Sequence, residues 1–150
     1  MGALARGFRC ARSDSAGSWG VYLVFRADET APVFLERSAG GQHKRNDPSV
    51  SRDVLEANWV DAFVVYIGKG NHGQLRTRLK EYAKAGAGKN HGHHGGRLIW
   101  QLAGGQDLLI AWRILPAELA PLREEKRMIC EFRESYGKPP FANDPHRQGR

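Results

Sequence analysis

The amino-acid sequence predicts an α+β fold, an α/β sandwich in which a small, mainly antiparallel three-stranded sheet is flanked by helices. Short runs of β-branched and aromatic residues predict the strands, at residues 19–25, 63–67 and 107–115. Longer segments with apolar residues at helical spacing, at 74–85 and 121–136, predict helices that pack on the sheet. The chain has 150 residues, the usual size of one domain with its own core.

Residues 1–18 predict a flexible N-terminal arm, because they are rich in Gly, Ser and Arg and show little periodicity. The arginines there are not followed by the apolar run of a secretory signal. Cys10 and Cys130 do not form the pattern of a disulfide framework, so we expect a reducing compartment. No apolar stretch approaches the roughly 18 residues of a membrane span. These features favour an intracellular, cytoplasmic protein that does not enter membranes.

The segment of about 27–61 predicts an insertion between the first two strands. Within it, a short strand could lie at 33–35, and residues 38–49 predict a loop because they contain Gly, Asn and Pro. A short helix would follow, with Ser51 or Asp53 in the position of an N-terminal cap.

The second strand is followed by glycines that predict a flexible turn, Gly68, Gly70 and Gly73. After the helix at 74–85, the sequence predicts a Gly- and His-rich loop and a helical turn at 97–102. Pro116 ends the third strand. The last helix has Pro in its first turn and Gly directly after its last residue, as helix termini favour. Residues 144–150 predict a C-terminal tail.

Positive charge predominates in the chain. It has 23 Lys and Arg residues against 16 Asp and Glu residues, which gives a formal net charge of +7. A domain this basic attracts polyanions, because each neutralised phosphate releases condensed counterions. The charge therefore favours a nucleic-acid partner, but it does not indicate which reaction the protein would catalyse.

Glu125 occupies an unusual position in the last helix. Leu122, Ile129, Phe132 and Tyr136 recur at helical spacing, and Glu125 falls on the same face. A carboxylate in an apolar stripe must be paired, protonated or metal-bound. The alternative is that Glu125 only borders the stripe and reaches solvent or an arginine.

Arg78 lies in a comparable position, between Leu75 and Tyr82 at the edge of an apolar stripe. A guanidinium held there would present a rigid fork to a phosphate, although a snorkelling side chain or a structural ion pair is the simpler alternative. Two strand tyrosines, Tyr22 and Tyr66, are by themselves ordinary sheet residues.

Two other sequence patterns do not predict a metal site or a phosphate-binding loop. His91, His93 and His94 look like a metal tract, but no cysteine lies close in sequence, so a solvated or phosphate-contacting loop is the better interpretation. Gly68-Lys69-Gly70 lacks the remaining residues of a phosphate-binding loop.

Five short motifs follow one another in the order that one nuclease family shows. They are Gly20-Val21-Tyr22, Val65-Tyr66-Ile67-Gly68 with Lys69 after it, Arg78-Leu79-x-x-Tyr82, Glu125-x-x-x-Ile129, and Asn143. Together they resemble the GIY-YIG nuclease superfamily over residues 19–143. The chain departs from the family in the long connection between Tyr22 and Tyr66, which contains the insertion, and in the slightly late position of Arg78.

The resemblance implies a metal-dependent endonuclease that hydrolyses phosphodiester bonds in nucleic acid, with DNA the favoured substrate. Glu125 would hold Mg²⁺ or Mn²⁺, which retain much of their hydration beside a single carboxylate. Tyr22 would accept a proton from the attacking water or orient it, and Tyr66 would hydrogen-bond the water or a phosphate oxygen. Arg78 would neutralise the phosphate. Asn143 would shape the pocket by fixing the end of the last helix.

A phenol acts as a base at neutral pH only beside positive charge, and Lys69 and Arg78 are the candidates to supply it. Further nucleic-acid contacts are expected from Lys69, Lys80 and the basic run of the insertion, His43, Lys44 and Arg45. The insertion could equally be a surface elaboration. A non-catalytic nucleic-acid-binding module on the same fold is the main alternative, and an interaction domain with an accidental likeness is a second.

Overall fold

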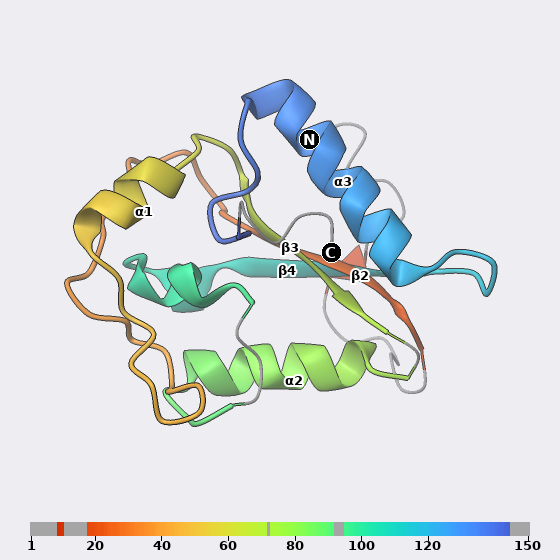
Figure 1. Ribbon diagram of the computed structural model, residues 1–150, viewed down its shortest axis with the longest axis horizontal. Helices are drawn as coiled ribbons and strands as arrows, with labels where there is room; N and C mark the ends of the chain where they lie inside the picture. Colours follow the sequence, from red (N-terminus) through yellow and green to blue (C-terminus); the bar gives the residue numbers. More distant parts are fainter. Residues whose placement is uncertain (1–8, 11–17, 72, 92–94, 145–150) are drawn as a thin grey trace.

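The computed structural model describes residues 9–10, 18–71, 73–91 and 95–144. These residues form a four-stranded antiparallel sheet with helices packed on both faces (Figure 1). The sheet order is β1-β4-β2-β3, with bounds Arg9–Cys10 for β1, Gly20–Phe25 for β2, Val64–Gly70 for β3 and Leu109–Ile114 for β4. The predicted α+β class is therefore confirmed.

The described α-helices are α1 (Arg52–Asn58), α2 (Leu75–Gly86) and α3 (Pro121–Tyr136). Short 3₁₀ helices, η1 (Arg97–Gln101) and η2 (Gly105–Asp107), precede β4. The predicted helices thus lie where periodicity placed them. None of the helices in the described part of the chain is long and apolar enough to cross a membrane.

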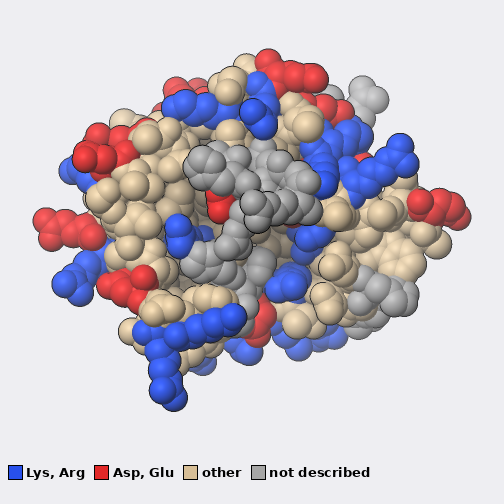
Figure 2. Space-filling view, viewed as in Figure 1, with Lys and Arg blue, Asp and Glu red and all other residues tan. Residues whose placement is uncertain are grey.

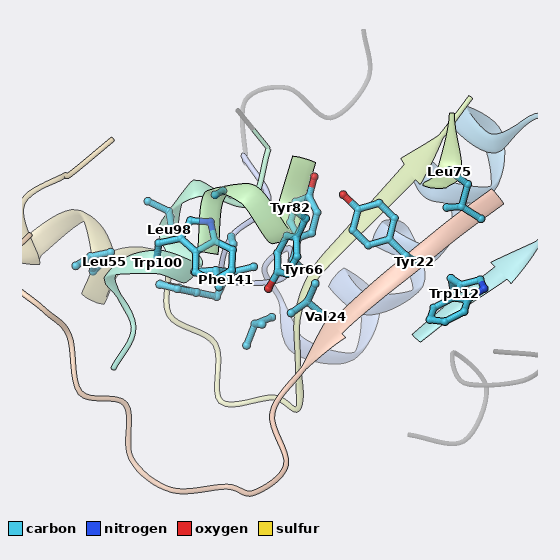
Figure 3. Close-up of a cluster of buried hydrophobic side chains, with 14 residues drawn as sticks. Tyr22, Val24, Leu55, Tyr66, Leu75, Tyr82, Leu98, Trp100, Trp112 and Phe141 are labelled. Atoms are coloured by element: carbon cyan, nitrogen blue, oxygen red, sulfur yellow. The ribbon is translucent and has the colours of Figure 1, made fainter. Parts of the chain in front are cut away.

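Alternate residues of β2 divide the apolar interior into two clusters. Tyr22 and Val24 point toward α2, whereas Val21 and Leu23 point toward α3. Figure 3 shows the cluster on the α2 side, and Figure 1 shows the two helices on opposite faces of the sheet. A sheet buried on both faces explains why β2 is apolar at almost every position instead of alternating with polar residues.

Strand β3 runs further than the sequence predicted, through the glycines assigned to a turn. A Cβ on Gly68 would lie 2.4 Å from Cζ of the Tyr22 ring, and one on Gly70 would lie 2.2 Å from Cα of Leu75. These glycines therefore let neighbouring groups approach the strand closely, and Gly73, with φ of +67°, makes the turn before α2.

The N-terminal segment adds a short edge strand to the sheet, beyond the three predicted strands. Arg9 and Cys10 pair with Trp112 and Ala111 at the outer edge of β4. An edge strand offers unpaired backbone groups to any extended segment, and two residues show no periodicity from which such pairing could be predicted. Residues 1–8 and 11–17 of the arm, and 145–150 of the tail, lie outside the described residues.

The insertion packs against the domain as part of its core. The Gln101 side chain is 1% exposed and joins η1 to the insertion: its Oε1 accepts from the Val50 backbone at 2.8 Å, and its Nε2 donates to Leu35 and Val50 carbonyls at 3.1 and 2.9 Å. The possible strand at 33–35 is a single bridge from Phe34 to Leu102. Ser51 caps α1 by position, without a side-chain hydrogen bond.

Candidate active site

Tyr22 and Tyr66 lie side by side between the sheet and α2. The register pairs Tyr22 with Gly68 and Val24 with Tyr66, so both phenols emerge on the α2 face, where their ring centroids are 5.8 Å apart (Figure 3). Tyr22 is completely buried and Tyr66 is 6% exposed. No hydrogen bond of ordinary geometry from a described residue satisfies the Tyr22 hydroxyl, although Tyr66 lies close enough to shift its pKa.

The electrostatics of the two phenols differ from the expected ones. Burial raises the pKa of Tyr22 well above its ordinary value, and the neighbouring Tyr66 and Glu125 raise it further. Burial and the Glu125 charge raise the pKa of Tyr66 to about 12, against smaller opposing effects of Tyr22 and Arg78. Desolvation thus outweighs the lowering by Arg78, which acts on Tyr66, and both phenols are neutral at physiological pH.

A third tyrosine, to which the sequence assigned no role in the site, lies beside these two. Tyr82 of α2 is 6% exposed, its ring is tilted against that of Trp100 with the centroids 4.8 Å apart, and its hydroxyl finds no hydrogen-bond partner among the described residues. Burial and the Tyr66 phenol raise the pKa of Tyr82. An unsatisfied buried hydroxyl costs about 1–3 kcal/mol, so two of them beside Tyr66 suit a place where a polar ligand supplies the missing bonds.

Arg78 in the first turn of α2 faces this group. Its side chain is partly buried, as expected for the edge of the stripe, and its charge lowers the pKa of Tyr66. The planar guanidinium group has a donor geometry that matches a phosphate.

Glu125 and Lys69 belong to the α3 side of the sheet. Lys69 pairs with Val21 across the strands and so points toward α3, where its Nζ lies 3.7 Å from Oε2 of Glu125. The two side chains are 27% and 17% exposed. Burial raises the pKa of Glu125, and the Lys69 ammonium only partly offsets the effect. The Glu125 charge nevertheless raises the pKa of Tyr22 and Tyr66 on the other face of the sheet.

The apolar stripe predicted around Glu125 is only partly correct. Ile129 and Phe132 are buried, but Leu122 and Tyr136 are 41% and 44% exposed. Ile129 and Phe132 belong to the middle turns of α3, where its buried residues gather, whereas Leu122 and Tyr136 lie in its first and last turns.

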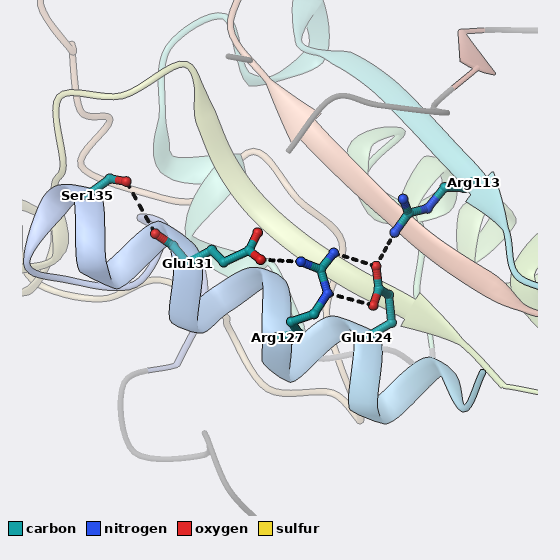
Figure 4. A network of polar contacts seen from close by, with 5 residues as sticks. All are labelled: Arg113, Glu124, Arg127, Glu131 and Ser135. Carbon is teal, nitrogen blue, oxygen red and sulfur yellow. Dashed lines mark hydrogen bonds and ion pairs between the residues drawn. The ribbon is translucent and has the colours of Figure 1, made fainter. Parts of the chain in front are cut away.

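Glu124, the neighbour of Glu125, is the more buried carboxylate, and sequence reasoning missed it. Arg127 donates to both of its oxygens, from Nε at 2.9 Å and from Nη2 at 2.7 Å, and Arg113 of β4 contacts Oε1 as well (Figure 4). These bonds lower the pKa of Glu124. The spacing of Glu124 and Arg127 on one helix was the available signal. With its oxygens held by guanidiniums, Glu124 is structural, whereas Glu125 is the carboxylate open to another ligand.

Asn143 holds a strand and not the end of the last helix, which corrects its expected role. Its Oδ1 accepts from the Ile67 backbone N–H at 2.9 Å, and its Nδ2 donates to the Ile67 carbonyl at 2.8 Å. The side-chain amide therefore replaces a neighbouring strand at the outer edge of β3, and Ala142 adds a backbone bond to Val65 at 2.8 Å. Asn143 thus fixes the strand that carries Tyr66 and Lys69.

The basic run of the insertion is not brought to the tyrosines. His43, Lys44 and Arg45 lie in a turn at the far end of α2 from Arg78, next to Ala85. Lys80 lies along α2 between Arg78 and this turn, on the exposed side of the helix. In the Gly- and His-rich loop, the His91 ring lies 5.9 Å from that of His43, whereas His93 and His94 fall outside the described residues.

The described residues contain no group of three or more His, Cys, Asp or Glu side chains arranged to hold a metal ion. Any cation at Glu125 would therefore take its remaining ligands from water or from a bound anion. Comparison with protein families, with curated proteins and with solved structures finds no match for this chain.

Proposed function

We propose that the protein is a metal-dependent endonuclease of the GIY-YIG type, which hydrolyses phosphodiester bonds in DNA within the cell. The observation that carries the proposal is the pair of buried rings Tyr22 and Tyr66, 5.8 Å apart, with the charges of Arg78 and Glu125 both acting on Tyr66, although the four residues come from four separate elements. The motif order in the sequence is the second support. A carboxylate can hold a metal ion, and a guanidinium and neutral phenols can donate to phosphate oxygens in metal-assisted phosphoryl chemistry.

The donor set fits Mg²⁺ or Mn²⁺. Glu125 is a single carboxylate whose ion-pair partner in the described part of the chain, Lys69, lies at the long distance of 3.7 Å. Mg²⁺ binds through one or two carboxylates and keeps several waters, so one such group suffices. When bound, the cation would supply positive charge for the leaving oxygen. Its charge would also offset the desolvation that raises the pKa of Glu125.

Each remaining residue of the site either binds the substrate or positions another residue. Arg78 binds the phosphate and neutralises part of its developing charge. Tyr22 and Tyr66 are neutral, so each donates a hydrogen bond to a phosphate oxygen or to the attacking water, and the unsatisfied Tyr22 hydroxyl gains its missing partner in this way. Because the pKa of Tyr22 is raised, orienting the water suits it better than removing a proton. Asn143 is a positioning residue, since it acts through β3.

Cleavage of supercoiled plasmid with Mg²⁺ or Mn²⁺ tests the proposal. We expect wild type to nick or linearise the plasmid and Glu125→Ala to lose cleavage by at least about 100-fold, as for loss of a key electrostatic group. Glu134→Ala is the matched control, because Glu134 is exposed on the same helix. Cleavage by Glu125→Ala at the rate of Glu134→Ala would refute the assignment. Tight salt-dependent binding without cleavage by any variant would instead indicate a non-catalytic binding module.

A further inference from the structure

The solvent face of α2 carries a row of basic side chains. Arg76, Lys80 and Lys84 are all exposed and recur every four residues, so they lie on one face with about 6 Å between neighbours. Glu81 is the single acidic residue of this helix, and its Oε1 is 2.8 Å from Nζ of Lys84. Figure 2 shows Lys and Arg side chains along the lower edge of the molecule, where α2 lies in Figure 1.

The insertion extends this row beyond the end of the helix. Its loop is bound to the C-terminal end of α2, because the Gly41 backbone N–H donates to the Ala85 carbonyl at 2.9 Å. His91 holds the loop from the other side, through its backbone bond to Gln42 at 3.3 Å and its Nε2, which lies 3.2 Å from the Gly41 carbonyl. The turn that follows, with Lys44 and Arg45 exposed at its tip, is therefore fixed relative to the row on α2.

The backbone of that turn is in a conformation that its residues disfavour. Lys44 and Arg45 have φ of 52° and 66°, the left-handed region, and the Asn46 N–H donates to the His43 carbonyl at 3.0 Å to close the turn. Two consecutive left-handed positions favour Asn-Gly or similar pairs, because a Cβ is strained there. Such strain is retained mainly at functional sites. Two long basic side chains at the strained tip therefore indicate a binding role.

We propose that Arg76, Lys80, Lys84 and the Lys44–Arg45 turn form a track for the phosphate backbone of double-stranded DNA. Charge complementarity favours this ligand, because the row of basic side chains faces solvent. The carboxylate of Glu81, the single acidic residue of the helix, is already paired with Lys84. From Arg76 to Lys84 the helix rises about 12 Å. One strand of a duplex carries a charge about every 3.4 Å of axis, so the row on α2 spans about three to four phosphate spacings.

The choice of DNA as the ligand rests on the proposed nuclease function, so the test measures binding without cleavage. A short fluorescein-labelled DNA duplex is titrated in EDTA at several salt concentrations and followed by anisotropy. Two variants each remove two charges from the track, Lys44→Ala with Arg45→Ala, and Arg76→Ala with Lys84→Ala. Each double variant should reduce the magnitude of the slope of log K, where K is the association constant, against the logarithm of the salt concentration by about 1.8. Each lost phosphate contact accounts for about 0.9 of this change.

The matched control removes the same charge elsewhere. Arg52 on α1 and Arg133 on α3 are exposed and lie outside the track, so Arg52→Ala with Arg133→Ala should leave the slope unchanged. An equal loss of slope in the control and the track variants would overturn the proposal, because binding would then follow net charge alone.

A fourth variant separates strain from binding. Lys44→Asn with Arg45→Gly gives the turn residues that its backbone favours. We expect a higher midpoint temperature of unfolding together with weaker DNA binding, a combination that a structural role for Lys44 and Arg45 would not produce. Unchanged binding by this variant would overturn the proposal. If the wild-type protein cleaves plasmid but every track variant keeps the wild-type salt dependence of binding, the track is refuted and the nuclease function is not. If the track variants have reduced slopes but the wild-type protein does not cleave plasmid, the nuclease function is refuted and the track is not.

Discussion

The Tyr22 hydroxyl is a buried polar group whose removal should affect stability and activity in opposite directions. It is completely buried, and the described residues leave it without an ordinary hydrogen bond. In Tyr22→Phe we expect the free energy of unfolding to rise by about 1 kcal/mol, because an unsatisfied group is lost. Plasmid cleavage should fall by about 100-fold or more, because the water or phosphate loses its donor.

Urea unfolding and plasmid cleavage check this pair of effects. Tyr136→Phe is the control, because Tyr136 is 44% exposed and stacks on Phe132 away from the site, so neither quantity should change. A loss of stability in Tyr22→Phe would show that the hydroxyl has a partner in the folded protein.

Two adjacent carboxylates of α3 should respond to pH with opposite signs. The pKa of Glu124 is lowered by its bonds to Arg127, so its contribution to stability is present above the unfolded-state pKa and is lost as the pH falls through the folded-state value. The pKa of Glu125 is raised by burial, so folding is favoured below its unfolded-state pKa and weakened as the pH rises through the folded-state value.

Substitution by Gln separates the two carboxylates. At neutral pH in EDTA, Glu124→Gln should lower the free energy of unfolding by about 1–3 kcal/mol, because guanidiniums lose a charged acceptor. Glu125→Gln should raise it by about 0.5–2 kcal/mol, the usual gain when a residue kept for function is replaced. Both differences should shrink in acid, as urea unfolding at several pH values would show. The same sign for both variants would contradict this account.

The regular elements could be predicted from the sequence because their apolar residues recur at the period of the structure they form. The strands β2 and β4 and the helices α2 and α3 are of this kind. Strand β1 was missed because two residues carry no period, and the end of β3 was missed because glycine usually indicates a turn. Glycine stands at positions 68 and 70 for another reason, since the Tyr22 ring and the Leu75 backbone fill the space of a side chain.

The residues of the candidate site were identified from motif order, whereas their surroundings depend on tertiary packing. Glu124 binds Arg113 from a different element, and Gln101 binds backbone groups some 50 to 66 positions away. Periodicity within one segment carries no information on such partners. Desolvation of Tyr22 and Tyr66 likewise depends on α2 and β2 meeting, so the direction of their pKa shifts required the structure.

The whole domain should unfold as one unit that includes the insertion. Gln101 satisfies backbone groups of Leu35 and Val50 from a position that is 1% exposed. In Gln101→Leu these groups lose their partner, so the free energy of unfolding should fall by about 1–3 kcal/mol. Tryptophan fluorescence and far-UV circular dichroism should still report coincident transitions in urea.

The control for this prediction is Gln106→Leu, which removes one exposed hydrogen bond to the Gly86 carbonyl. Surface changes of this kind alter stability by less than about 0.5 kcal/mol. Separate transitions for the two signals in wild type would mean that the insertion folds on its own.

The amide of Asn143 also bears on how the protein behaves when it is concentrated or stored. Strand β3 is an outer strand of the sheet, and an open outer strand is a template for pairing with another copy. The Asn143 side chain and Ala142 occupy the outward backbone groups of Ile67 and Val65, so they block that pairing. Conversion of Asn143 to Asp would turn a carboxylate oxygen toward the Ile67 carbonyl and release the strand. The same side chain that positions the candidate site therefore protects the protein from aggregation.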